Sequence, residues 1–173
     1  NVKISYGEDN TGNLYNLCNI KHFSNQFSND VDFITADGGF DFSFNFNKQE
    51  QLSYRIIFCE IITALSIQKI GGTFVIKFFD IYTDITYSLI YLLYTHYNNI
   101  YISKPNTSRP ANSEKYIICK EFKGIEEIYL KKLYIMVKNW EYIDENNMVV
   151  SKLFKLDDQD FIKKIININT KFY

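Results

Sequence analysis

The chain is poor in the residues that metal chemistry depends on. Among 173 residues there are three cysteines and two histidines. Cys18, Cys59 and Cys119 are far apart and form no Cys-x-x-Cys pair, and neither His22 nor His96 has the spacing of a zinc ligand. An odd number of scattered cysteines is typical of reduced thiols inside a cell. We therefore expect no metal site and an intracellular protein, in the nucleus or cytoplasm and of cellular or viral origin.

Long apolar runs and an excess of charge are missing as well. No run reaches the roughly 18 apolar residues of a membrane span, and the first residues lack a secretion signal, so we expect no membrane partner. The formal net charge is −1, so nucleic acid would have to bind through a local patch. The motifs G-x-G-x-x-G and G-x-x-x-x-G-K-[ST] are absent, which argues against a dinucleotide oxidoreductase or a phosphate loop.

The chain does contain enough apolar residues for a packed core. The apolar share is 46% and the aromatic share 17%, which suits one domain of this length. Runs of apolar residues and helical periodicity predict alternating strands and helices up to residue 124, followed by a more helical part. The predicted helices are 16–27, 50–69, 84–97, 125–142 and 157–169, and the predicted strands are 31–36, 73–79, 100–102, 115–120 and, as an extended segment, 149–156.

This order predicts half of an α/β sheet. Strands linked through helices should be parallel, whereas the last two are joined by about ten residues without a helix and should be antiparallel. Gly71-Gly72 is expected to end the second helix, and Asn98-Asn99 to turn the chain after the third. Four strands would leave one sheet edge bare, so we expect upstream strands to complete the sheet.

Three charged residues should meet at one rim of this sheet. Asp37 follows the first strand, Lys77 lies at the end of the second, and Glu114 enters the antiparallel strand from its loop. Ligands of open parallel sheets bind at the carboxyl ends of the strands. Neighbouring carboxylates raise the pKa of a lysine, whereas partial burial lowers it. A lysine whose pKa is brought near neutrality in this way can take a proton from a sugar hydroxyl. The carboxylates would also favour a sulfonium methyl donor, and in-line methyl transfer depends mainly on positioning.

Each residue also has a simpler interpretation. An Asp before Gly-Gly is often a turn residue, and a Lys at a strand end often extends its amine to solvent. The aromatic loop 40–46 could stack a base, although a loop that covers the core is the more common case. The lysines of 120–138 are typical of a solvated helix face. The expected meeting of Asp37, Lys77 and Glu114 is therefore more informative than any one of these residues.

Taken together, the motifs resemble the FtsJ-type ribose 2′-O-methyltransferases, and within them the cap-specific mRNA 2′-O-methyltransferases. The likeness extends from about residue 6 to residue 123 and is longest over Lys104–Tyr116. The matching stretches are Ala36–Phe40 (ADGGF), Gln49–Ser53 (QEQLS), Ala64–Ile67 (ALSI), Gly71–Asp80 (GGTFVIKFFD), Tyr91–Tyr94 (YLLY), Lys104–Tyr116 (KPNTSRPANSEKY) and Cys119–Lys120 (CK).

The resemblance implies a fold, an activity and roles for residues. The fold is the Rossmann-like class I methyltransferase fold, of which this chain would be the C-terminal half of a mostly parallel sheet with one antiparallel strand. The activity is transfer of a methyl group from S-adenosylmethionine to the ribose 2′-hydroxyl of RNA, with the 5′ end of capped mRNA as partner. Asp37, Lys77 and Glu114 match the last three members of the family's Lys-Asp-Lys-Glu tetrad, with Lys77 as general base.

Binding positions follow from the same resemblance. Asp37 lies beside the methyl donor in the family, and an acidic residue is more usual at the position of Asn13. Ser108 and Arg109 belong to a loop beside the substrate groove, and Asn47 falls where cap enzymes contact RNA. The implied donor contacts are Asn13, Leu14 and Asp37, and the implied RNA contacts are Asn47, Ser108 and Arg109.

The family's first catalytic Lys and its Gly-rich donor-binding turn do not occur in these residues. We therefore expect a piece of a longer protein that alone binds the donor poorly and is inactive. Residues 1–124 would be the C-terminal part of the methyltransferase domain, and 125–173 a helical extension packed on it. The alternative is a catalytically inactive module that binds RNA or a protein partner. A base-directed methyltransferase is disfavoured, because Asp37-Gly38-Gly39-Phe40 replaces its Asp/Asn-Pro-Pro-Tyr/Phe motif.

Overall fold

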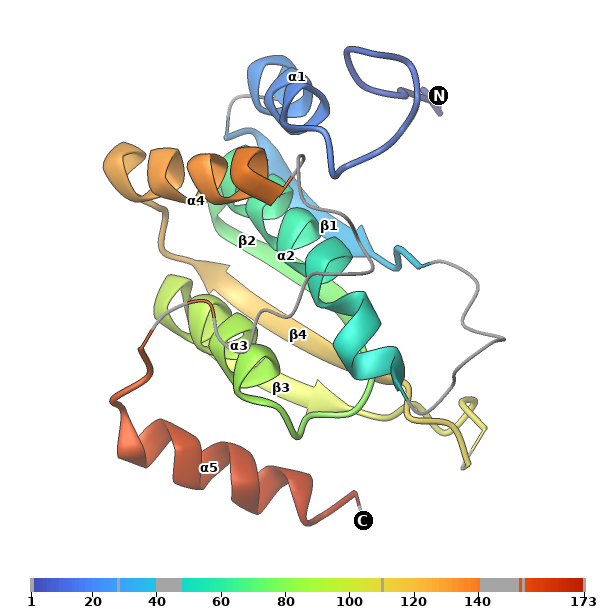
Figure 1. The fold of residues 1–173 in the computed structure, drawn as a ribbon, viewed down its shortest axis with the longest axis vertical. Coiled ribbons are helices and arrows are strands. Elements are labelled where there is room, and N and C mark those ends of the chain that lie inside the picture. Colours follow the sequence, from blue (N-terminus) through green and yellow to red (C-terminus); the bar gives the residue numbers. More distant parts are fainter. Residues whose placement is uncertain are drawn as a thin grey trace.

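The computed structural model shows helices and strands in the predicted order (Figure 1). It describes residues 2–27, 29–39, 48–109, 111–140, 153 and 155–172. The predicted aromatic loop 40–46 and most of the predicted extended segment 149–156 lie outside the described residues. The elements are α1 (Leu17–Phe27), β1 (Val31–Ala36), α2 (Gln49–Ile67), β2 (Gln68–Phe78), α3 (Asp84–His96), β3 (Tyr97–Ser103), β4 (Lys115–Phe122), α4 (Glu127–Trp140) and α5 (Gln159–Asn169).

The described strands form one four-stranded sheet with the order β1-β2-β4-β3. β1 and β2 are parallel, and β4 runs antiparallel to both of its neighbours, β2 and β3. The predicted sheet, mostly parallel with one antiparallel strand, is therefore confirmed. β4, the last of the described strands, lies inside the sheet between two strands that precede it in the sequence.

The core lies between the sheet and the helices α2 and α3, which lie on the same face of the sheet (Figure 1). Burial alternates along β2, where Phe74, Ile76 and Phe78 are buried and Val75 and Lys77 are half-buried on the other side. A fully buried side chain of this size contributes roughly 1.5–3 kcal/mol. This packing fixes the ends of the strands, where the predicted charged residues lie.

Two predictions about turns are wrong. Helix α2 ends at Ile67, and Gln68 is already extended, so Gly71 and Gly72 lie within β2. They occupy an irregularity of the β1–β2 pairing between Gln68 and Thr73. Gly71 has a φ of +85°, and a Cβ on Gly72 would lie 2.8 Å from Gln68 Cγ, so glycine is needed for this bend in the strand. The second wrong prediction is the turn at 98–99, because both residues lie in β3.

The C-terminal helices pack on the same core. Trp140 of α4 contacts the ring of Phe58 of α2 at 4.8 Å between centroids, and Phe161 of α5 contacts Tyr91 of α3 at 4.9 Å. Asn169 of α5 donates a hydrogen bond of 2.6 Å to the carbonyl of Ile81, in the loop after β2. The boundary at residue 124 stays a prediction. None of the described helices has the length and apolar character needed to cross a membrane.

Candidate active site

An ion pair joins the ends of the two parallel strands. Ala36 of β1 is in register with Ile76 of β2, so the next residues, Asp37 and Lys77, lie side by side. Asp37 directly follows β1, and Lys77 is still within β2. Lys77 Nζ forms an ion pair with Asp37 Oδ1. The lysine side chain is 18% exposed and the aspartate side chain 62% exposed. The amine of Lys77 is therefore largely buried, whereas the carboxylate that it contacts is open to solvent.

Glu114 reaches the same end of the sheet through Tyr116. β4 begins opposite the end of β2, and Tyr116 is the cross-strand partner of Lys77. The Tyr116 hydroxyl donates a hydrogen bond of 2.7 Å to Glu114 Oε1, which raises the pKa of Tyr116 to about 12. Asn112 Nδ2 donates to Glu114 Oε2 at 3.3 Å. Within the described part of the chain, Tyr116 links Glu114 to the Lys77 pair, and no hydrogen bond or ion pair joins Glu114 and Lys77 directly.

A second carboxyl group, that of Glu60, lies under this pair, and the sequence reasoning missed it. Glu60 belongs to α2, is 6% exposed, and accepts a hydrogen bond of 2.6 Å from the backbone N–H of Gly38. Burial raises the pKa of Glu60 to about 7, although the Gly38 hydrogen bond and Lys77 act in the opposite direction. The available signal was one acidic residue within an otherwise apolar stretch of helix, 56–62.

The loop before Glu114 is fixed by a lysine. Lys104 Nζ donates to the carbonyl of Asn112 at 2.6 Å, to Asn112 Oδ1 at 2.7 Å and to the carbonyl of Glu114 at 3.2 Å. Ser108 Oγ also donates to Asn112 Oδ1, at 3.1 Å. Ser108 therefore bonds within the loop, whereas Arg109 is exposed.

A cavity of about 720 Å³ opens beside this loop. Arg109 and Glu114 line it, together with Glu50, Asp80 and Tyr82. Its lining therefore combines a basic residue with acidic and aromatic residues. The predicted RNA contact Asn47 lies outside the described residues.

The predicted donor contacts Asn13 and Leu14 lie in a loop that is held by its own hydrogen bonds. The Asp9 carboxylate accepts from the Thr11 hydroxyl and from the side-chain amides of Asn16 and Asn19, and these bonds hold the pKa of Asp9 well below its usual range. Asn19, fully buried, also donates to the carbonyl of Asn13 at 2.8 Å. Among the residues that the structure describes, no hydrogen bond or ion pair links this loop to Asp37.

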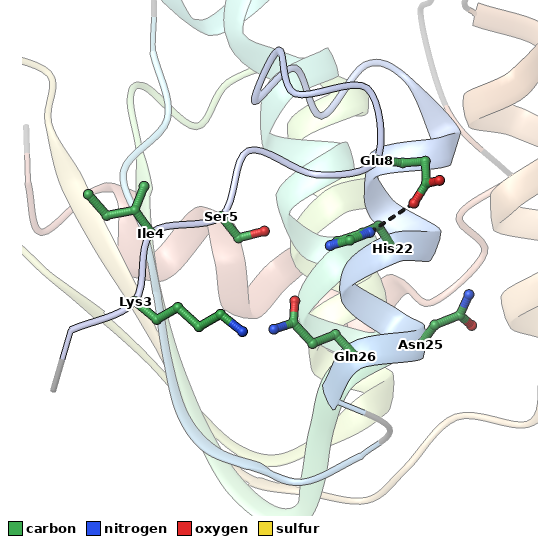
Figure 2. Close-up of a pocket in the computed structure, with 7 residues that line it drawn as sticks. All are labelled: Lys3, Ile4, Ser5, Glu8, His22, Asn25 and Gln26. Atoms are coloured by element: carbon green, nitrogen blue, oxygen red, sulfur yellow. Dashed lines mark hydrogen bonds and ion pairs between the residues drawn. The ribbon is translucent and has the colours of Figure 1, made fainter.

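A second cavity, of about 460 Å³, lies between the N-terminal segment and α1 (Figure 2). Lys3 and Gln26 line it, and His22 Nδ1 contacts Glu8 Oε2 at 3.0 Å. None of the predicted site residues lines this cavity. In the described ranges, no group of three or more His, Cys, Asp or Glu residues could hold a metal ion.

The mostly parallel sheet with a single antiparallel strand and the charged pair at the strand ends agree with a class I methyltransferase fold. Residues 3–122 match the FtsJ-like methyltransferase family, and the chain belongs to this family. A Plasmodium falciparum protein described as a ribosomal RNA methyltransferase has a similar fold, with a TM-score of 0.51 and 20% identity over 72% of this chain and 64% of that one.

Sequence relatives carry a more specific description. The chain is 37% identical over 176 residues to the cap-specific mRNA (nucleoside-2′-O-)-methyltransferase 1 of Homo sapiens, and 35% identical over 177 residues to that of Drosophila melanogaster. The chain is also 35% identical over 179 residues to the protein of the same description from Dictyostelium discoideum. These alignments cover 95–98% of this chain but only 21–23% of each relative, so the chain spans about a fifth of their length.

Proposed function

We propose that the protein transfers a methyl group from S-adenosylmethionine to the ribose 2′-hydroxyl of RNA, at the first nucleotide of capped mRNA. The observation that carries this proposal is the Asp37–Lys77 ion pair at the carboxyl ends of two parallel strands. Relatives described as cap-specific 2′-O-methyltransferases support the choice of substrate. Such a substrate places the reaction in the nucleus or cytoplasm, where mRNA occurs.

Lys77 would serve as the general base. Once deprotonated, its amine would accept the proton of the 2′-hydroxyl. The oxygen would then bond to the methyl carbon while the bond from that carbon to the donor's sulfur breaks, and the sulfur would leave as a neutral thioether. The ammonium that results is stabilised by the Asp37 carboxylate, through the ion pair that the structure contains. Glu114 and Tyr116 add a hydrogen-bonded acidic group on the other side of Lys77.

Asn13, Leu14 and Asp37 would hold the methyl donor. When bound, S-adenosylmethionine supplies a methyl group on a positively charged sulfur. An exposed carboxylate such as that of Asp37 suits this charge, and the Asp9 and Asn19 bonds fix the Asn13 backbone in advance. The exposed carboxylate of Asp37 and the fixed backbone of Asn13 support this role.

The RNA would lie over the cavity beside residues 104–114. Arg109 is exposed at this cavity, where a guanidinium can bind a phosphate group through two hydrogen bonds. Ser108 and Asn112 hold the loop in shape. Asn47 is a further contact in this proposal.

The test is transfer of a labelled methyl group by the intact protein to capped RNA and to the same RNA without a cap. Product analysis should place the label on the 2′-oxygen of the first nucleotide of capped RNA. Label on uncapped RNA alone would refute the cap substrate. Binding of capped RNA without any transfer would favour the non-catalytic module.

A further inference from the structure

Glu60 is a buried acidic residue that the proposed reaction does not use. It lies on α2, packed under the turn that follows β1, and its Oε1 accepts the Gly38 amide at 2.6 Å. Its Oε2 is buried and has no hydrogen-bond partner among the residues that the structure describes. Burying a carboxyl group in this way costs free energy of folding. The group that it binds, the Gly38 amide, therefore indicates its role.

Both residues of the Glu60–Gly38 contact are needed for it. A Cβ on Gly38 would overlap Glu60 Oε1 and lie 3.0 Å from Ile56 Cγ1, so the carboxyl occupies the space that a side chain at position 38 would fill. Gly38 directly follows Asp37, whose carboxylate pairs with Lys77. The bond to Gly38 therefore fixes the peptide unit that carries Asp37 out of the sheet.

We propose that Glu60 is a positioning residue for the Asp37–Lys77 pair: its buried carboxyl holds the Gly38 amide and so determines where the Asp37 carboxylate meets Lys77. The catalytic importance of this pair rests on the proposed methyl transfer. The positioning itself rests on the hydrogen bond and on the close approach at Gly38. Within the described part of the chain, the charged groups that act on Glu60 are Lys77 of β2 and Asp37 at the end of β1.

Two substitutions separate the hydrogen bond from generic packing. Glu60→Gln keeps a carbonyl oxygen for the Gly38 amide, whereas Glu60→Met keeps the length of the side chain and removes the acceptor. Ile62→Met is the matched control, because Ile62 is fully buried on the same helix but lies two residues further along and faces another direction. Should Glu60→Met fail to fold, Gly38→Ala disturbs the same contact from the strand side.

Two spectroscopic readings do not need methyl transfer. Hydrogen exchange of the Gly38 amide should be slow in the wild type and in Glu60→Gln, and about tenfold faster in Glu60→Met, the factor expected for the loss of one buried hydrogen bond. The Lys77 side-chain ammonium resonance, a probe of its pairing with Asp37, should persist in Glu60→Gln and shift in Glu60→Met. Unchanged exchange at Gly38 in Glu60→Met would overturn the proposal.

The kinetic reading uses a double-mutant cycle with Asp37→Asn. Glu60→Met should lower kcat at least tenfold with little change in KM, Glu60→Gln should recover it to within about threefold, and Ile62→Met should leave it unchanged. Because Glu60 acts through Asp37, adding Glu60→Met to Asp37→Asn should cause no further loss. Effects that simply multiply would contradict the proposal. A wild type that transfers no methyl group refutes the proposed function, while exchange at Gly38 still decides the role of Glu60.

Discussion

Lys77 on β2 and Tyr116 on β4 are cross-strand partners, so their side chains emerge on the same face of the sheet. The tyrosine hydroxyl is turned toward Glu114, to which it donates a hydrogen bond. The negative charges of Glu114 and Asp37 both oppose ionisation of Tyr116. The register of the β2–β4 pair therefore brings Glu114, through Tyr116, to the end of the sheet where Lys77 lies.

Tyr116→Phe should weaken the site without dismantling it. The substitution removes the 2.7 Å hydrogen bond to Glu114 and keeps the ring. One such bond to a carboxylate corresponds to about 1.5 kcal/mol, or about a tenfold loss in kcat/KM for methyl transfer. Tyr101→Phe, on the exposed side of β3, is the control and should retain full activity. Equal rates for the two variants would remove Tyr116 from the site.

Lys77→Met should abolish methyl transfer while the protein stays folded. Loss of a general base lowers a rate by about 10²- to 10⁴-fold. The control is Lys69→Met, because Lys69 lies on the same strand and forms an exposed ion pair of 3.3 Å with Asp32 of β1. Transfer rates and thermal unfolding should be measured for both. Activity of Lys77→Met at the wild-type level would exclude Lys77 as the base.

Glu60 should make the stability of the protein depend on pH. Burial raises the pKa of Glu60 to about 7 in the folded state, above its usual value of 4.5. The folded state thus holds this proton more tightly than the unfolded chain, so the stabilisation is full below about pH 4.5 and is lost as pH rises through about 7. Over this window the free energy of unfolding should fall by roughly 3 kcal/mol relative to Glu60→Gln.

Urea unfolding at pH 5, 6, 7 and 8 measures this difference. Glu127→Gln is the control, because Glu127 is exposed on α4 and the hydrogen bond from Lys131 lowers its pKa. This variant keeps Glu60, so its stability should fall with rising pH in parallel with that of the wild type. Parallel pH curves for the wild type and Glu60→Gln would show that the Glu60 carboxyl ionises in the folded protein as it does in water.

Lys104→Met should release the loop that carries Glu114. Its amine makes three hydrogen bonds, two to Asn112 and one to the Glu114 carbonyl. We expect faster amide exchange over residues 106–114 and at least a tenfold lower kcat/KM for RNA, because the lost bonds are charge-assisted. Lys131→Met, which removes an exposed ion pair of 2.7 Å on α4, should change neither quantity. An unaltered loop in Lys104→Met would contradict this role.

Much of the fold is predictable because apolar runs and helical periodicity reflect burial directly. The meeting of Asp37 and Lys77 was predictable for a similar reason, since neighbouring parallel strands end at the same edge. Sequence could not show that residues 69–72 depart from the ladder. Gly71 and Gly72 resemble a helix C-cap in the sequence, but in the structure they allow β2 to bend at this point.

The parts of the site that escaped prediction depend on tertiary contacts. A glutamate in a helix normally faces solvent, and only the packing of α2 under the end of β1 shows that Glu60 meets the Gly38 amide. Tyr116 ends the motif Lys104–Tyr116, but its contact with Glu114 and its place opposite Lys77 follow from the register of β4. Register between distant segments is set by the whole sheet rather than by local pattern.

The position of β4 between β2 and β3 also determines the order in which the sheet can be assembled. During synthesis β2, α3 and β3 leave the ribosome first, and the gap between the two strands is filled only when residues 115–122 follow. A nascent chain that ends before residue 115 has Asp37 and Lys77 but lacks the tyrosine partner of Lys77 and the central strand. Pairing over this sequence distance is slow compared with helix formation. The group formed by Asp37, Lys77, Glu114 and Tyr116 is thus complete only after a late step of folding.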